Sequence, residues 1–134
     1  MRGVRSMAST QSLSGQKILV VEDEWLIADY LATMLEDLEC VVVGPVSTVE
    51  EALTSIAAGN IDCVLLDANL KGESSAPIAD ALAADAVPFI VVTGYGGLEL
   101  ATDTMNSAPR LGKPLVEADL RNTLELALAQ NSSK

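Results

Sequence analysis

The chain has 134 residues and a net charge of −11, from 19 acidic against 8 basic residues, and it contains no histidine. Its length suffices for one domain with a hydrophobic core, and its acidity argues against nucleic acid or a membrane surface as partner, because both recruit clustered cations. The missing histidines exclude Ser/His/Asp triads, imidazole acid–base catalysis and histidine-ligated zinc.

The two ends of the chain are expected to lie outside the folded unit. Residues 1–16 lack the apolar segment of a signal peptide and are expected to form a disordered tail, and residues 131–134 form a short C-terminal tail. The domain is therefore expected to span residues 17–130, with no output domain after it. Cys40 and Cys63 each lie inside an apolar run, which favours buried thiols in a reducing cytoplasm.

Short apolar runs alternate with helical patterns along this domain. The runs are nearly continuous in Val, Ile and Leu, which is typical of strands that a parallel sheet buries on both faces. The expected strands are residues 17–21, 40–43, 61–67, 87–93 and a very short 109–112. The segment 68–75 that follows the third strand is polar and is expected to be a loop.

Between the strands, apolar residues recur every three or four positions, as they do on one face of a helix. Ser47 and Thr48 each have a glutamate three residues later, a doubled capping box that predicts a helix start. Helices are expected from Glu24, after Thr48, near Pro77, over the weakly patterned residues 98–106, and over residues 117–130. This alternation predicts an α/β fold with a parallel sheet and helices on both faces.

Residues that can carry chemistry stand where these strands end. They are Glu22, Asp23 and Glu24 after the first strand, Asp67 at the end of the third, Thr93 at the end of the fourth, and Lys113 after the fifth. In such a sheet the carboxyl ends of the strands border the functional crevice. Clustered carboxylates repel one another, and Mg²⁺ would relieve this repulsion and leave room for phosphoryl oxygens. Lys113 and the Thr93 hydroxyl would contact those oxygens, which predicts phosphoryl transfer.

On these motifs the chain resembles the receiver domain of two-component response regulators. The matching pieces are ILVVEDE with the acid pair Glu22 and Asp23, VLLDANL with Asp67, VVTG with Thr93, and GKP with Lys113. The resemblance implies a flavodoxin-like (CheY-like) (βα)5 receiver fold whose five-stranded parallel sheet has strand order 2-1-3-4-5. It also implies that Asp67 is the phosphoacceptor. Mg²⁺ would be bound by Asp23, Asp67 and the main-chain carbonyl of Asn69, with Glu22 acting through water.

The resemblance also implies partners and a mode of action. A histidine kinase or histidine phosphotransferase would supply the phosphoryl group, and the chain would not be an enzyme beyond autocatalytic phosphotransfer and autodephosphorylation. The runs NLKGESSAPIADAL and VPFIVVTGYGG resemble the alphaproteobacterial FAT GUY subgroup, which pairs with HWE or HisKA2-type kinases and often consists of stand-alone receivers. We therefore expect a cytoplasmic, stand-alone response regulator that contacts a downstream protein target or acts as a phosphate sink.

Two positions depart from the usual receiver pattern. Lys71 stands four residues after Asp67, where a proline is usual, and Arg110 stands where an aromatic switch residue is usual. Because arginine is permanently charged, it cannot serve as an aromatic pivot. We expect residues 94–106, which include Tyr95, to become ordered on phosphorylation instead.

Three other interpretations are less consistent with the residues. A receiver-like interaction module that never turns over phosphate would be expected to lose Glu22, Asp23, Asp67 or Lys113, and all four are present. A small phosphatase with an aspartate nucleophile commonly carries a second aspartate two residues later, where this chain has Asn69. A flavin-binding protein of this fold would need a phosphate-cradling loop after the first strand, and the chain has no obvious one.

Overall fold

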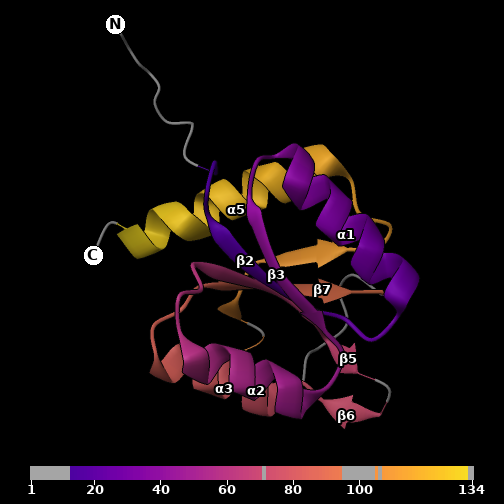
Figure 1. Ribbon diagram of the computed structural model, residues 1–134, viewed down its shortest axis with the longest axis vertical. Helices are drawn as coiled ribbons and strands as arrows, with labels where there is room; N and C mark the ends of the chain where they lie inside the picture. Colours follow the sequence, from indigo (N-terminus) through magenta and orange to yellow (C-terminus); the bar gives the residue numbers. More distant parts are fainter. Residues whose placement is uncertain (1–12, 71, 95–104, 106, 133–134) are drawn as a thin grey trace, which may run out of the picture.

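A parallel sheet forms the middle layer of the molecule, with helices on both of its faces (Figure 1). The computed structural model describes residues 13–70, 72–94, 105 and 107–132. The strands of this sheet are β2 (Lys17–Val21), β3 (Val41–Val46), β4 (Cys63–Asp67), β7 (Phe89–Thr93) and β8 (Arg110–Gly112). The helices of the described part are α1 (Trp25–Asp37), α2 (Val49–Ala58), α3 (Ala76–Ala84) and α5 (Glu117–Ser132).

The strand order of the sheet is β3-β2-β4-β7-β8. When these five strands are counted along the chain, the order is 2-1-3-4-5, which confirms the predicted topology. Every neighbouring pair is parallel. All five carboxyl ends therefore lie at one edge of the sheet, and the central strand β4 is flanked there by β2 and β7.

Alternation along the strands divides the core into two layers. On β2, Ile18 and Val20 belong to the apolar layer under α1 and α5, whereas Leu19 and Val21 belong to the layer under α2 and α3. Figure 1 shows these two helix pairs on opposite faces of the sheet. The central strand β4 is buried along its whole length, which is why its sequence is continuously apolar before Asp67.

The helix α2 begins after Thr48, as the Thr48–Glu51 half of the predicted doubled capping box indicates. The Thr48 hydroxyl accepts a hydrogen bond from the Glu51 N–H at 3.1 Å, and Glu51 Oε1 accepts one from the Ser47 N–H at 3.0 Å. The N–H groups of Glu51 and Ser47, which have no hydrogen-bond partner within the helix backbone, thus donate to side chains. The helix buries Ala52 and Ile56 against the sheet, whereas Ala57 is exposed.

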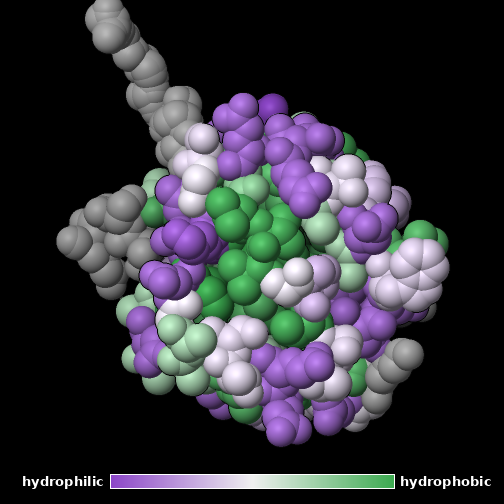
Figure 2. Space-filling model, in the orientation of Figure 1, coloured by the Kyte–Doolittle hydropathy of each residue, from purple (hydrophilic) through white to green (hydrophobic). Residues whose placement is uncertain are grey.

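β3 is an open edge of the sheet and extends beyond its expected end at Val43. It continues through Gly44 and Pro45 to Val46, because an edge strand tolerates a residue without an N–H. Gly44 has φ 84°, and a Cβ there would lie 2.8 Å from Val46 N, so the position requires glycine. Val41 is 47% exposed, and Figure 2 shows apolar surface in the middle of the face along which β3 runs.

The predicted tail is too long by several residues at its C-terminal end. Leu13 is only 5% exposed and belongs to the core layer under α1 and α5. The Gly15 N–H donates to Glu39 O at 2.8 Å, and Gln16 O accepts from the Val41 N–H at 2.8 Å. Residues 13–16 therefore pack as part of the folded unit. The one apolar side chain in this polar stretch, Leu13, is sufficient to attach the segment to the core. Residues 1–12 lie outside the described residues.

Two further expectations concern the segments after β4 and β7. The expected loop 68–75 contains two short antiparallel strands, β5 (Asn69–Leu70) and β6 (Glu73–Ser74), whose inward residue Leu70 is buried. The expected helix over residues 98–106, and the ordering expected of residues 94–106, fall outside the described residues except at Gly94 and Met105. Within the described part, no helix has the length and apolar character that crossing a membrane requires.

Candidate functional site

The fold brings predicted site residues from four strands to the carboxyl edge of the sheet. Glu22 directly follows β2, Asp67 is the last residue of β4, and Thr93 is the last residue of β7. Lys113 follows β8, and its main-chain N–H donates to Thr93 O at 2.9 Å. Because β2, β4, β7 and β8 are successive neighbours in the sheet, residues that are far apart in sequence meet at this edge.

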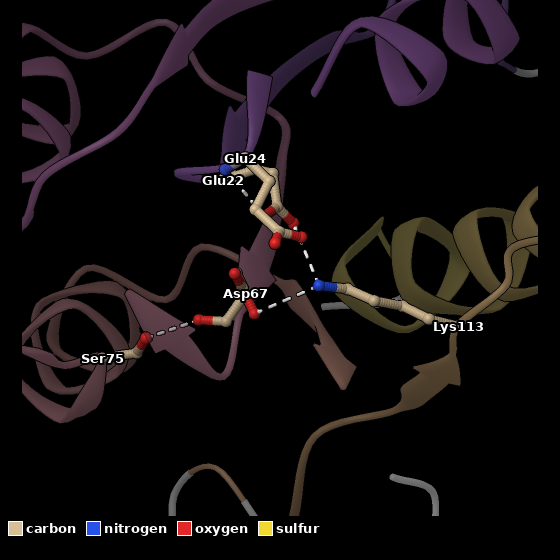
Figure 3. A network of polar contacts seen from close by, with 5 residues as sticks. All are labelled: Glu22, Glu24, Asp67, Ser75 and Lys113. Atoms are coloured by element: carbon tan, nitrogen blue, oxygen red, sulfur yellow. Dashed lines mark hydrogen bonds and ion pairs between the residues drawn. The ribbon is translucent and has the colours of Figure 1, made fainter. Parts of the chain in front are cut away.

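Lys113 extends between two buried carboxylates (Figure 3). Its Nζ lies 3.5 Å from Glu22 Oε1 and 3.7 Å from Asp67 Oδ1. Glu22 is 2% exposed and Asp67 is 5% exposed, whereas the lysine side chain retains contact with solvent. One cation therefore faces two acids from which most of the water has been removed, and this arrangement leaves an excess of negative charge.

The two carboxylate oxygens of Glu22 have different surroundings. Oε2 accepts a hydrogen bond from the Glu24 N–H at 3.2 Å. Oε1 is buried and accepts no hydrogen bond from the described residues, although it forms the ion pair with Lys113. Burial, and then the nearby Asp67 carboxylate, raise the pKa of Glu22 from 4.5 to about 7.

The carboxylates of this edge fit a divalent cation. Glu22, Asp23 and Asp67 each place an oxygen within 4.8 Å of the others. An under-bonded, buried Glu22 oxygen beside two further carboxylates is the hard oxygen environment that Mg²⁺ prefers. Asp23 is half-buried, so the cluster remains accessible to an ion and its water ligands.

Removing divalent cations should make the stability of the protein depend on pH through Glu22. Between pH 4.5 and about 7 the folded state keeps a proton on Glu22 that the unfolded state releases, so the free energy of unfolding should fall as pH rises through this window. The upper bound of the loss is about 3 kcal/mol. Urea unfolding in EDTA across this range should show the slope, and Glu22→Gln should remove it. Saturating Mg²⁺ should flatten it as well, and an unchanged slope in Glu22→Gln would contradict the assignment.

Other predicted site residues are placed less completely. Thr93 is 7% exposed at the end of β7, in agreement with a position in the site. The backbone of Asn69 begins β5, two residues after Asp67. Arg110 is half-buried at the start of β8. The contact of Thr93 with a phosphoryl group and the role of the Asn69 carbonyl stay predictions.

Two contacts of the site were not anticipated from the sequence. The Glu24 N–H orients the Glu22 carboxylate, and the Ser75 hydroxyl donates a hydrogen bond to the main-chain carbonyl of Asp67 (Figure 3). Ser75 is fully buried just before α3. The sequence offered no signal for this contact, because a serine before a helix ordinarily indicates a cap.

A five-stranded parallel α/β sheet with an acidic cluster and a lysine at its carboxyl edge defines a flavodoxin-like protein of the CheY-like, receiver class. In agreement, the family model described as the response regulator receiver domain matches residues 18–125. The chain therefore belongs to the receiver domain family of two-component signalling. Receiver domains bind Mg²⁺ at their acidic site, receive phosphoryl groups from histidine kinases or phosphotransferases, and act as phosphoacceptors that are generally not enzymes.

Individual relatives support this assignment. The chain is 31% identical over 121 residues to the sensory transduction protein LytT of Bacillus cereus, covering 88% of this chain and 49% of LytT. The chain thus spans about half the length of the curated relatives that it matches. The solution structure of SdrG from Sphingomonas melonis Fr1 is similar with 42% identity and a TM-score of 0.75, over 88% of this chain and 98% of SdrG.

A second similar structure contains the predicted metal. The receiver domain of the sensor histidine kinase PA1611 from Pseudomonas aeruginosa PAO1 has 25% identity and a TM-score of 0.75, over 87% of this chain and 99% of that one. That structure has a magnesium ion coordinated in its active site cleft.

Proposed function

We propose that this chain accepts a phosphoryl group on Asp67 from a phosphohistidine of a partner protein, in a reaction that requires Mg²⁺. The position of Lys113 between the buried Glu22 and Asp67 carboxylates is the observation that carries the proposal. In the reaction, a carboxylate oxygen of Asp67 forms a bond to phosphorus while the bond between phosphorus and the donor imidazole nitrogen breaks. The donor nitrogen leaves with the electron pair of that bond.

The residues of the site divide the work of this transfer. Asp23, Asp67 and the main-chain carbonyl of Asn69 would hold Mg²⁺, with Glu22 acting through water. The ion would supply neutralising charge for the phosphoryl oxygens. The Lys113 ammonium would bind a phosphoryl oxygen that the metal leaves free, and the Thr93 hydroxyl would donate a hydrogen bond to another.

We further propose a stand-alone, cytoplasmic response regulator of the FAT GUY subgroup, with an HWE or HisKA2-type kinase as donor and a downstream protein as target. The identity of 42% with SdrG exceeds the 21–26% with five other receiver structures, and it supports the existence of a closer subgroup. This proposal is tested by measuring phosphotransfer to the chain from purified HWE and HisKA2-type kinases and from purified histidine kinases of other types. Rapid transfer from one HWE or HisKA2-type kinase is expected, and equal or faster transfer from kinases of other types would contradict the subgroup.

Binding of Mg²⁺ should require Asp23 and should be visible in the fluorescence of Trp25. Trp25 is the first residue of α1, two positions after Asp23, and its side chain is 77% exposed rather than buried in the core. A titration of the wild-type chain with Mg²⁺ should change the emission. Asp23→Asn should raise the half-saturating concentration by more than about tenfold, because it removes a charged ligand.

The matched control for this titration is Glu24→Gln. Glu24 is adjacent in sequence and exposed, and it contributes its main-chain N–H rather than its carboxylate to the site. This variant should bind Mg²⁺ nearly as the wild type does. An Asp23→Asn titration that overlays the wild-type curve would show that the metal role is wrong.

A further inference from the structure

The segment that follows Asp67 forms a small hairpin beside the site. Its strands β5 and β6 pair in antiparallel register, with Asn69 opposite Ser74 and Leu70 opposite Glu73. The hairpin starts two residues after Asp67 and ends directly before Ser75. The geometry of the Asp67 backbone and that of the proposed Asn69 ligand therefore depend on how the base of this hairpin is closed.

Ser75 closes the base of the hairpin with its side chain. The residue is fully buried, and its Oγ donates a hydrogen bond to the main-chain carbonyl of Asp67 (Figure 3). Ser75 occupies the N-cap position of α3, where a serine normally accepts a hydrogen bond from a helix N–H, but it forms no such cap. The Ser74 hydroxyl accepts from the Ala76 N–H at 3.1 Å instead.

The peptide group between Asp67 and Ala68 is held at both of its polar ends. Its carbonyl accepts from Ser75, and its N–H donates to Val92 O on β7 at 2.9 Å. Because a peptide group is planar, two hydrogen bonds on opposite sides fix its orientation. That orientation sets ψ of Asp67 and φ of Ala68, and so determines the direction in which the chain leaves the phosphoacceptor.

The far arm of the hairpin is attached to a different element. Glu73 Oε1 accepts from the Val49 N–H, in the first turn of α2, at 3.4 Å. The hairpin is therefore anchored to α2 by Glu73 and to the end of β4 by Ser75. Without the Ser75 hydroxyl, the Asp67 carbonyl would lose this buried hydrogen bond or the base of the hairpin would shift.

We propose that Ser75 is a positioning residue of the phosphorylation site. It acts through the Asp67–Ala68 peptide group. By fixing this group, it holds the Asp67 carboxylate and the Asn69 carbonyl in the positions that metal binding and phosphoryl transfer require. The inference rests on the proposed function, because it assigns Ser75 a role in that same site. Groups that orient metal ligands from behind typically change metal affinity or activity by about 10–100-fold when they are removed.

The test compares Ser75→Ala with two matched variants. Ser74→Ala removes the neighbouring hydroxyl, which accepts a hydrogen bond from the Ala76 N–H in the first turn of α3. Ile78→Val trims a fully buried side chain of α3 and so lowers stability without altering the site. Each variant is titrated with Mg²⁺ by Trp25 fluorescence, phosphorylated with a small phosphodonor, and unfolded with urea in EDTA.

Ser75→Ala should raise the half-saturating Mg²⁺ concentration and slow phosphorylation, each by about tenfold or more. For Ser74→Ala and Ile78→Val, the half-saturating Mg²⁺ concentration and the phosphorylation rate should each stay within about twofold of the wild-type value, whatever stability these variants lose. A Ser75→Ala variant that loses stability but keeps wild-type Mg²⁺ affinity and phosphorylation rate would overturn the proposal.

Amide hydrogen exchange of Ala68 in the metal-free protein provides a readout that does not depend on phosphorylation. Ser75→Ala should speed this exchange at least about tenfold more than Ile78→Val does, because the Ala68 N–H belongs to the peptide group that Ser75 holds. Equal exchange in the two variants would also overturn the proposal. A wild-type chain that responds neither to Mg²⁺ nor to the phosphodonor would instead contradict the proposed function, and the Ala68 measurement separates the two failures.

Discussion

Phosphorylation should disappear when Asp67 is replaced by asparagine. Asp67 ends the central strand, and its carboxylate lies 3.7 Å from Lys113 Nζ and beside Glu22 and Asp23. An amide in its place is not nucleophilic and removes one charge from the metal cluster. Intact mass after incubation with Mg²⁺ and a small phosphodonor should show a phosphate adduct on the wild type and none on Asp67→Asn.

Asp62→Asn is the matched control for this experiment. Asp62 directly precedes β4 at its opposite end, where its carboxylate accepts from the Lys17 N–H at 2.8 Å. This variant loses a charge of the same type, far from the carboxyl edge, and keeps an oxygen that can accept from the Lys17 N–H, so it should accumulate the adduct as the wild type does. An adduct that survives Asp67→Asn would mean that another residue is the phosphoacceptor, and a chain that never forms one would favour an interaction module without phosphate turnover.

Lys113→Met should nearly abolish phosphorylation while leaving Mg²⁺ binding intact or tighter. Methionine retains much of the length of the side chain but removes the positive charge that pairs with Glu22 and Asp67. Loss of a group that stabilises charge in a transition state typically slows a reaction by about 10²–10³-fold. The lysine also repels a divalent cation, so its removal should not weaken Mg²⁺ binding at the same carboxylates.

Measuring phosphorylation and Mg²⁺ binding together makes the experiment decisive, because only phosphorylation should be lost. Rates of phosphorylation by a small phosphodonor and Trp25 titrations with Mg²⁺ are measured on the same preparations. Lys17→Met is the control, because Lys17 is an exposed lysine at the start of β2, at the other end of the sheet. Equal loss of Mg²⁺ affinity and phosphorylation in Lys113→Met would indicate a disturbed site rather than a missing charge, and would contradict the role of Lys113.

Local patterns predicted most of the fold. The strand over residues 17–21 and the α2 start at Thr48 agree with the structure, because continuous apolar runs and capping boxes act within a few residues. The hairpin in residues 68–75 could not be predicted from the sequence. Its pairing depends on Leu70 packing into the core beneath α3 and not on a repeating pattern of residues. Residues 13–16 were missed for the same reason, because Leu13 is stabilised by packing from distant elements.

The sequence by itself determined which residue types stand at the strand ends, and therefore that carboxylates and a lysine would meet at one edge. Glu22, Asp23, Asp67 and Lys113 could be identified in this way because strand order places successive carboxyl ends together. Only the tertiary structure decided how they interact. The burial that raises the Glu22 pKa to about 7, and the Ser75 bond to the Asp67 carbonyl, arise from segments far apart in sequence or from a backbone turn, and no residue pattern encodes either one locally.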